Sequence, residues 1–273
     1  VPSTFFGIYA KKDFGGNPPT PYPIFNNLSI HDTYIHDLAE GMYIGETISP
    51  GMEFRHLRIY NNVVINTLRE SVQIANCVED IEIYNNFFLN AGIENLSMQN
   101  NGLRIGTNTI ANVYNNIIIN APSFGVIVLG NGDIELKNNF IQNNAGIFID
   151  DRFETLPYSG IQLESNFFDQ INNVQIIENR NEFNDLFIRN NLYSSDILFF
   201  KNTIESLGLL DVSNNLFSNI TDFQYTIEDG VFFNSTQNPE SYQSLGPQNG
   251  LNNLFNDVPV LNLIDNIFIE YAS

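Results

Sequence analysis

The sequence predicts an all-β fold, a right-handed parallel β-helix (solenoid) in which short strands wind around one elongated core. A pair of residues, most often Asn-Asn, recurs at intervals of about 25 residues, a period typical of one solenoid turn and too short for a repeated helical hairpin. Apolar and polar residues alternate before each pair, which favours strands over helices. A large apolar residue follows each pair at a fixed distance. These observations predict about 8 to 9 turns of three short strands each, with Asn ladders.

The first strand of each turn ends at the Asn pair. In the segment 57–62, Leu57 and Ile59 face one side of the strand, whereas Arg58 and Tyr60 face the other. We expect the apolar side to face the core. The equivalent segments are 57–62, 81–86, 111–116, 134–139, 161–166, 186–191 and 210–215, with a degenerate first copy at 28–33.

The Asn residues predict ladders of hydrogen bonds at the corners of the solenoid. Stacked strands lie only about 4.8 Å apart, so a corner amide can reach its own backbone and the equivalent Asn of the next turn. We therefore interpret both columns of Asn residues as structural features rather than ligand sites. The second column, four residues after the pair, contains Asp37, Asn66, Asn90, Asn120, Asn143 and Asn219.

The second and third strands of each turn complete the predicted core. The second strand carries one large apolar residue at its centre, and the third often begins with Gly. The predicted core column is Ile35, Val64, Phe88, Ile118, Ile141, Phe168, Tyr193 and Phe217. The predicted third strands are 41–44, 71–74, 102–105, 125–128, 146–149, 173–176 and 197–200.

We expect residues 1–273 to form a single domain, because a solenoid grows in one dimension and needs no domain boundary. The sequence predicts an irregular N-terminal segment over 1–27, regular turns over 28–219, a loop insertion or cap over 220–260 and a possible last turn over 261–273. No signal peptide is visible and the chain opens with Val-Pro, so we expect a piece of a longer secreted protein.

The charge of the chain limits its partners. Eleven Lys and Arg stand against 31 Asp and Glu, giving a formal net charge of -20. We expect no binding to nucleic acid or to anionic membranes, because basic side chains bind phosphate groups. No apolar run is long enough to predict a membrane span. The single cysteine, Cys77, cannot form an internal disulfide and is predicted to be a packed or half-buried thiol.

The repeated xIxIxNN segment followed by GxxI resembles the right-handed parallel β-helix proteins of the pectate-lyase-like superfamily. The resemblance covers residues 28–219. This class includes many carbohydrate-active enzymes and many bacterial secreted or surface proteins. The resemblance therefore implies a fold and leaves the activity open.

An outward column on the third strands predicts a binding groove for a sugar chain. The column contains Tyr43, Gln73 and Arg104, and Asp150 lies in a later turn. Hydrogen-bonding groups beside an aromatic face are what a polysaccharide requires.

Two motifs suggest catalysis. Asp150 and Asp151 form a carboxylate pair of the kind used in glycoside hydrolysis, and they resemble part of the polygalacturonase pattern, although the Gly-His-Gly and Arg-x-Lys segments of that family are absent. The segment 100–107 resembles the Arg-Ile-Gly turn of alginate and chondroitin lyases, which implies a role for Arg104 alone. The alternative is structural: a local ion pair at the Asp-Asp corner, and an exposed Arg104 paired with Glu82 or Asp150.

The three histidines, His31, His36 and His56, occur with acidic residues in the first turns. They predict either an active or metal site or ordinary surface histidines, because no ligand spacing such as HExxH is present. Calcium is as plausible as a transition metal, since carboxylate and amide oxygens are abundant.

Two classes of function follow. The first is an extracellular or cell-surface protein that binds or degrades a polysaccharide as a lyase or glycoside hydrolase. The second is a noncatalytic scaffold, stalk or adhesion module that contacts other surface proteins. Apolar residues predicted to face outward discriminate between them, because they must be covered by flanking loops or by a partner. These residues are Ile127, Phe148, Ile177, Leu198 and Phe200.

Overall fold

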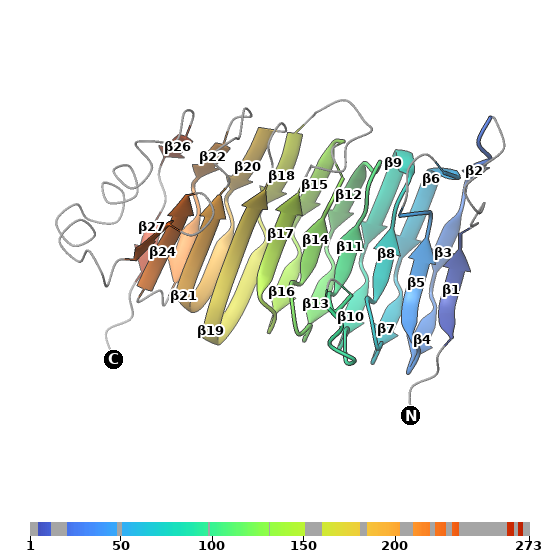
Figure 1. Ribbon diagram of the computed structural model, residues 1–273, viewed down its shortest axis with the longest axis horizontal. Coiled ribbons are helices and arrows are strands. Elements are labelled where there is room, and N and C mark those ends of the chain that lie inside the picture. The colour runs from blue at the N-terminus through green and yellow to red at the C-terminus, as the bar shows by residue number, and fades with distance from the viewer. Residues whose placement is uncertain are drawn as a thin grey trace.

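The computed structural model is an elongated parallel β-solenoid (Figure 1). Its strands follow one another along the long axis, from β1 (Phe6–Ala10) near the N-terminus to β27 (Ile267–Ile269) near the other end. No helix occurs in the described part of the chain. The structure describes residues 5–11, 21–47, 51–97, 99–130, 132–150, 160–180, 185–202, 210–218, 222–227, 231–234, 261–264 and 267–269.

The first row of strands forms one sheet. Its strands pair in parallel from one turn to the next, and both β2 and β3 pair with β6. The two strands β2 and β26 lie at its ends. The row consists of β2 (Ile24–Asn26), β3 (Ser29–His31), β6 (Glu53–Tyr60), β9 (Cys77–Tyr84), β12 (Ala111–Tyr114), β15 (Ile134–Lys137), β18 (Gly160–Glu164), β20 (Asp185–Arg189), β22 (Leu210–Ser213) and β26 (Leu261–Ile264).

The second row begins after each Asn pair and is also parallel. It contains the short strands that carry the predicted core column. These strands are β4 (Tyr34–His36), β7 (Val63–Ile65), β10 (Phe87–Leu89), β13 (Ile117–Ile119), β16 (Phe140–Gln142), β23 (Leu216–Ser218) and β27.

The third row is parallel through β17. Toward the other end, β24 pairs with β25 in the antiparallel direction. The strands are β1, β5 (Glu40–Ile44), β8 (Val72–Ile74), β11 (Leu103–Ile105), β14 (Val126–Val128), β17 (Gly146–Asp150), β24 (Asp222–Ile227) and β25 (Val231–Asn234).

The three-row parallel solenoid confirms the predicted architecture. The right-handed coiling and the count of 8 to 9 turns stay predictions. Strands β1 and β2 lie within residues 1–27, where the sequence predicts an irregular segment. Strands β26 and β27 continue the first and second rows over the predicted last turn.

Two long strands break the expected pattern of three short ones. Strands β19 (Phe167–Arg180) and β21 (Leu192–Asn202) each run through both the second and the third row. Gly146 is in register with Ile176, not with Asn173 as the predicted strands imply. We attribute the difference to the missing glycine. Without a small residue at that corner, the chain continues in an extended conformation.

The shift in register also overturns the prediction that Ile177 faces outward. Phe148 is in register with Glu178, whereas the predicted strands 146–149 and 173–176 would pair it with Gln175. Ile177 is buried in the main core rather than exposed on the outer face. Leu198 and Phe200 lie in β21, and for these two residues the structure describes the backbone alone.

The predicted core column is confirmed. Each of its members is in register with the next, and the side chains described from Ile35 to Tyr193 are buried. Phe168 and Tyr193 stack with their ring centroids 4.8 Å apart. Phe217 continues the register after Tyr193. Cys77 lies fully buried in the same core, as predicted.

The second Asn of each pair forms a buried ladder, as predicted. The Asn86 backbone N–H and Nδ2 both donate to Oδ1 of Asn116, at 3.0 and 2.9 Å. Asn116 repeats this pattern with Asn139 and also donates to the Ile83 carbonyl. The residue before each ladder position has a left-handed φ, which Asn tolerates better than most residues. The ladder is Asn62, Asn86, Asn116, Asn139, Asn166, Asn191 and Asn215.

The second Asn column forms a more exposed ladder. Asn66 donates to Asp37, and the bonds continue through Asn90 and Asn120 to Asn143, with lengths of 2.9 to 3.1 Å. The remaining residue predicted for this column, Asn219, lies outside the described residues.

Candidate functional site

The predicted outward column is in register on the third row. Tyr43 pairs with Gln73, Gln73 with Arg104, and the column continues through Ile127 to Phe148. Its early members are polar and its later members apolar, as the sequence indicates. The column is nevertheless largely covered: Tyr43 is half-buried, Gln73 is 4% exposed, and Ile127 and Phe148 are buried.

Two buried glutamates lie beside this column. Glu40 and Glu70 each lie two residues before a paired residue of β5 and β8, so they occupy equivalent positions in neighbouring turns. Glu70 Oε1 lies 3.5 Å from Nη1 of Arg104. Arg104 therefore pairs with Glu70, whereas the predicted partner Glu82 binds Arg58. In the sequence, Glu40 and Glu70 lie at the same distance before two aligned third strands, and this shared spacing could have identified them.

The environment of the glutamates changes their protonation. Burial, followed by the charge of Glu70, raises the pKa of Glu40 to about 8. Burial also raises the pKa of Glu70, which the Arg104 charge partly offsets. Glu40 is therefore mainly protonated at neutral pH. A neutral acid beside a second carboxyl group is a pattern used in acid–base catalysis, but Glu40 is only 2% exposed.

Residues of the first turn contact Tyr43. Lys11 Nζ donates to its hydroxyl at 3.0 Å and lies 4.5 Å from the ring centroid. The rings of Phe6 and Tyr9 lie 6.0 and 5.8 Å away. These contacts occupy the hydroxyl and part of the ring that the sequence analysis assigned to a sugar.

Asp150 lies at the end of β17 and is buried. Two residues before it, Phe148 packs with Ile127, Leu129 and Phe124 in a small apolar cluster. The structure therefore places Asp150 two turns beyond Arg104, as the last residue of an otherwise apolar strand. Asp151, the second carboxylate of the predicted pair, lies outside the described residues.

The three histidines bond three different aspartates. His31 and His36 are exposed and His56 is half-buried. His31 bonds Asp32 at 2.8 Å, and His36 bonds Asp37 at the same distance. The hydrogen bond from the histidine lowers the pKa of each aspartate.

His56 bonds Asp80 at 2.9 Å and lowers its pKa in the same way. Among the residues that the structure describes, no group of three or more His, Cys, Asp or Glu could hold a metal ion. A calcium ion bound with amide and backbone oxygens stays a prediction.

An aromatic stack that the sequence analysis missed lies on the outer face of the first row. The rings of Tyr60, Tyr84 and Tyr114 lie 5.0 and 4.9 Å apart and are nearly parallel, and His31 stacks on Tyr60. The shared Tyr before three of the Asn pairs was the signal that could have found it. Because the rings cover one another's faces, they present mainly edges and hydroxyl groups to a ligand.

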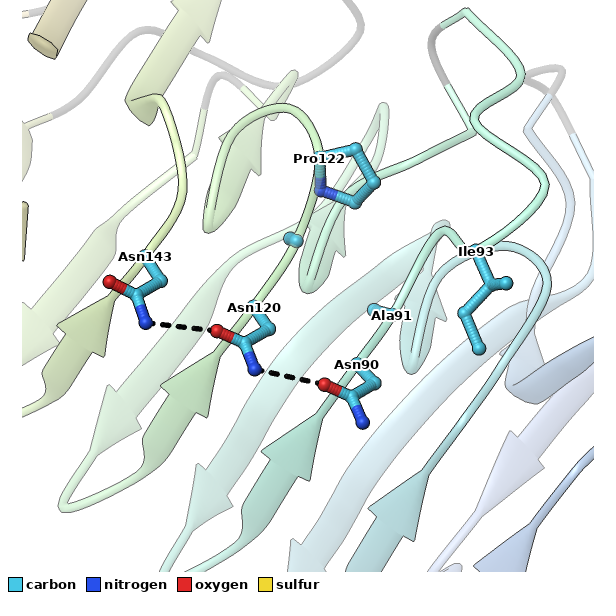
Figure 2. Close-up of a pocket in the computed structure, with 7 residues that line it drawn as sticks. Asn90, Ala91, Ile93, Asn120, Pro122 and Asn143 are labelled. Carbon is cyan, nitrogen blue, oxygen red and sulfur yellow. Dashed lines mark hydrogen bonds between the residues drawn. The ribbon is translucent and has the colours of Figure 1, made fainter. Parts of the chain in front are cut away.

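A depression of about 410 Å³ lies along the exposed Asn ladder (Figure 2). The amides of Asn90, Asn120 and Asn143 lie in a row beside it, with Pro122 and Ile93 near the opposite side. The side-chain amides that line this depression are hydrogen-bonded to one another in the ladder.

The parallel sheets and the two Asn ladders define this protein as a parallel β-solenoid. A segment of 152 residues is 31% identical to metabotropic glutamate receptor-like protein Q of Dictyostelium discoideum. The match covers 54% of this chain but only 12% of that protein.

No protein-family model matches the chain. No solved structure matches it either. Membership of the pectate-lyase-like superfamily stays a prediction. In the described ranges, no helix is long and apolar enough to cross a membrane.

Proposed function

We propose that this chain is a noncatalytic solenoid module of a longer cell-surface protein, serving as a scaffold, stalk or adhesion module. The observation that carries the proposal is the placement of the candidate catalytic side chains. Among the described candidates, Glu40, Glu70 and Asp150 are buried and Arg104 is half-buried against Glu70, whereas each histidine bonds a different aspartate.

This placement is unfavourable for polysaccharide cleavage. Glycoside hydrolysis requires two carboxyl groups that reach opposite sides of a scissile bond, about 5 to 10 Å apart. Glu40 and Glu70 are close enough for the Glu70 charge to shift the pKa of Glu40, but both are enclosed. Glu70 is also engaged by Arg104, an arrangement that stabilises neighbouring turns.

The ladders support a mechanical role. Seven buried Asn side chains link consecutive turns through repeated hydrogen bonds along the long axis. A continuous ladder stiffens a one-dimensional fold, because each turn is held by its neighbours. The name of the longer relative, a receptor-like protein, supports placing such a module at a cell surface.

The alternative is a polysaccharide lyase or hydrolase. One specific observation favours it: Glu40 is protonated near neutral pH and lies close enough to Glu70, Arg69 and Arg104 for their charges to affect it. An enzyme could use this group as an acid if the neighbouring segments opened to admit a substrate.

A cleavage screen tests the proposal. The full chain is incubated with plant, algal and animal polysaccharides, with and without calcium, and both reducing ends and unsaturated products are measured. We expect neither signal. Cleavage that is lost in Glu40→Gln or Arg104→Ala, but kept in His36→Ala, would establish the enzymatic alternative and refute the noncatalytic one.

A glycan array with the same proteins tests adhesion separately. Binding that persists in Arg104→Ala and Glu70→Gln would indicate a surface other than the predicted groove. Binding abolished by Arg104→Ala would restore the groove of Tyr43, Gln73 and Arg104 as the sugar site.

A further inference from the structure

We propose that Asn27 and Asn95 are N-glycosylation sites whose glycans cover exposed apolar side chains. Both are followed by Leu-Ser, so each forms the acceptor sequence Asn-x-Ser. The inference rests on the proposed surface location in one respect, because the modification requires passage through a secretory compartment.

Asn27 lies between β2 and β3, at the end of the first row. It is exposed and has a left-handed φ of 60°. Its backbone N–H donates to the Arg55 carbonyl at 3.1 Å, which fixes the corner and leaves the side chain at the surface. Ser29, which completes the acceptor sequence, is also exposed.

Asn95 lies in the loop between β10 and β11. It is also exposed, with a φ of 51°. Its Oδ1 accepts a hydrogen bond from Nδ2 of Asn100 at 2.7 Å. This bond uses the oxygen of the amide, whereas a glycan is attached to the nitrogen. Ser97 is exposed as well.

Exposed apolar side chains provide an independent reason for glycans at these two places. Ile24 and Phe25 precede Asn27 and are 49% and 46% exposed. Ile93 and Leu96 flank Asn95 and are 50% and 39% exposed. Such side chains promote association, and β2 in addition is the outermost strand of its sheet. A large polar glycan beside them would oppose both effects.

The ladder asparagines provide the contrast. In the buried ladder, the residue two positions after each Asn is apolar, as in Asn62-Val-Val and Asn116-Ile-Ile. In the exposed ladder, Asn66, Asn90, Asn120 and Asn143 also lack Ser or Thr at that position. Modification at Asn27 and Asn95 would therefore leave both described ladders intact. Two more acceptor sequences begin at Asn219, outside the described residues, and at Asn234, the end of β25.

The chemistry needs a lipid diphosphate-linked oligosaccharide as the donor. The side-chain nitrogen Nδ2 forms a bond to C1 of the first sugar, while the bond from C1 to the phosphate oxygen breaks. The lipid diphosphate leaves, and the nitrogen loses one proton.

The test uses the full chain, secreted from eukaryotic cells behind an added signal sequence. N-glycans are removed enzymatically in water labelled with heavy oxygen, and peptides are analysed by mass spectrometry. We expect labelled Asp at positions 27 and 95 and unmodified Asn62 and Asn116. Secreted, folded protein with unmodified Asn27 and Asn95 would refute the proposal.

Matched variants separate the acceptor sequence from the fold. Ser29→Ala and Ser97→Ala should each remove one glycan, whereas Ser29→Thr and Ser97→Thr should keep it. Enzymatic removal of the glycans should increase binding of an apolar dye. Unchanged dye binding would refute the covering role. Because the host supplies the secretory route, these outcomes do not depend on the cleavage and glycan-array tests.

Discussion

Replacing Asn116 by Ala should markedly destabilise the solenoid. Asn116 is buried, and its Oδ1 accepts bonds from the backbone and side chain of Asn86. Its Nδ2 donates to Oδ1 of Asn139 and to the Ile83 and Tyr114 carbonyls. Alanine removes all of these bonds and leaves buried polar groups without their partner.

The expected loss is about 3 kcal/mol or more in the free energy of unfolding. Each hydrogen bond contributes about 0.5 to 1.5 kcal/mol, and a buried group left unsatisfied costs about 1 to 3 kcal/mol. The assay is urea unfolding followed by circular dichroism. A variant that unfolds at the same urea concentration as the wild type would refute the ladder as a source of stability.

Asn120→Gly is the matched control. It removes an exposed ladder amide, while glycine still accepts the left-handed φ of 60° at this position. Its cost should be below about 1 kcal/mol, since water can replace the lost bonds. An equal loss in both variants would indicate that burial does not determine the contribution of a ladder.

Three further predictions follow from individual residues. The pKa of Glu40 is about 8 in the folded protein, against an ordinary value of 4.5, so the free energy of unfolding should fall as the pH rises through this range. Urea unfolding of Glu40→Gln should show a weaker fall with pH. A pH profile identical to that of the wild type would contradict the raised pKa. Burial raises the pKa of the Cys77 thiol, so an alkylating reagent should modify it only after unfolding, as mass spectrometry would show. Rapid modification of the native protein would contradict the packing of Cys77. Asn115 has a left-handed φ of 56°, so Asn115→Val should lower the free energy of unfolding, measured in urea, by about 1 to 2 kcal/mol. Asn115→Gly should leave it nearly unchanged. Equal losses in the two variants would refute backbone strain as the cause.

The sequence predicted the regular part of the fold because each turn repeats the same local signals. The core column and both Asn ladders depend on fixed spacing from the Asn pair, and spacing is preserved from turn to turn. The register failed where that regularity ends. Ile176 takes the register position of Gly146, which the prediction gave to Asn173, and no local pattern distinguishes one long strand from two short ones there.

The candidate site was less predictable, because burial of polar side chains depends on contacts between distant segments. The alignment of Tyr43, Gln73 and Arg104 follows from the repeat. The enclosure of Gln73 and the packing of Lys11 on Tyr43 depend on other parts of the chain. Sequence neighbours likewise suggested a histidine cluster, whereas in the structure each histidine bonds a different aspartate.

The most direct test of the central claim is the accessibility of the third row in solution. Gln73→Cys places a thiol in the predicted groove, and Asn112→Cys places one on the exposed face of β12. Cys77 is buried and should stay silent in both proteins. The noncatalytic account predicts rapid labelling of Asn112→Cys by a thiol reagent and little labelling of Gln73→Cys under native conditions. Equally rapid labelling of both would reveal an open groove and contradict the account.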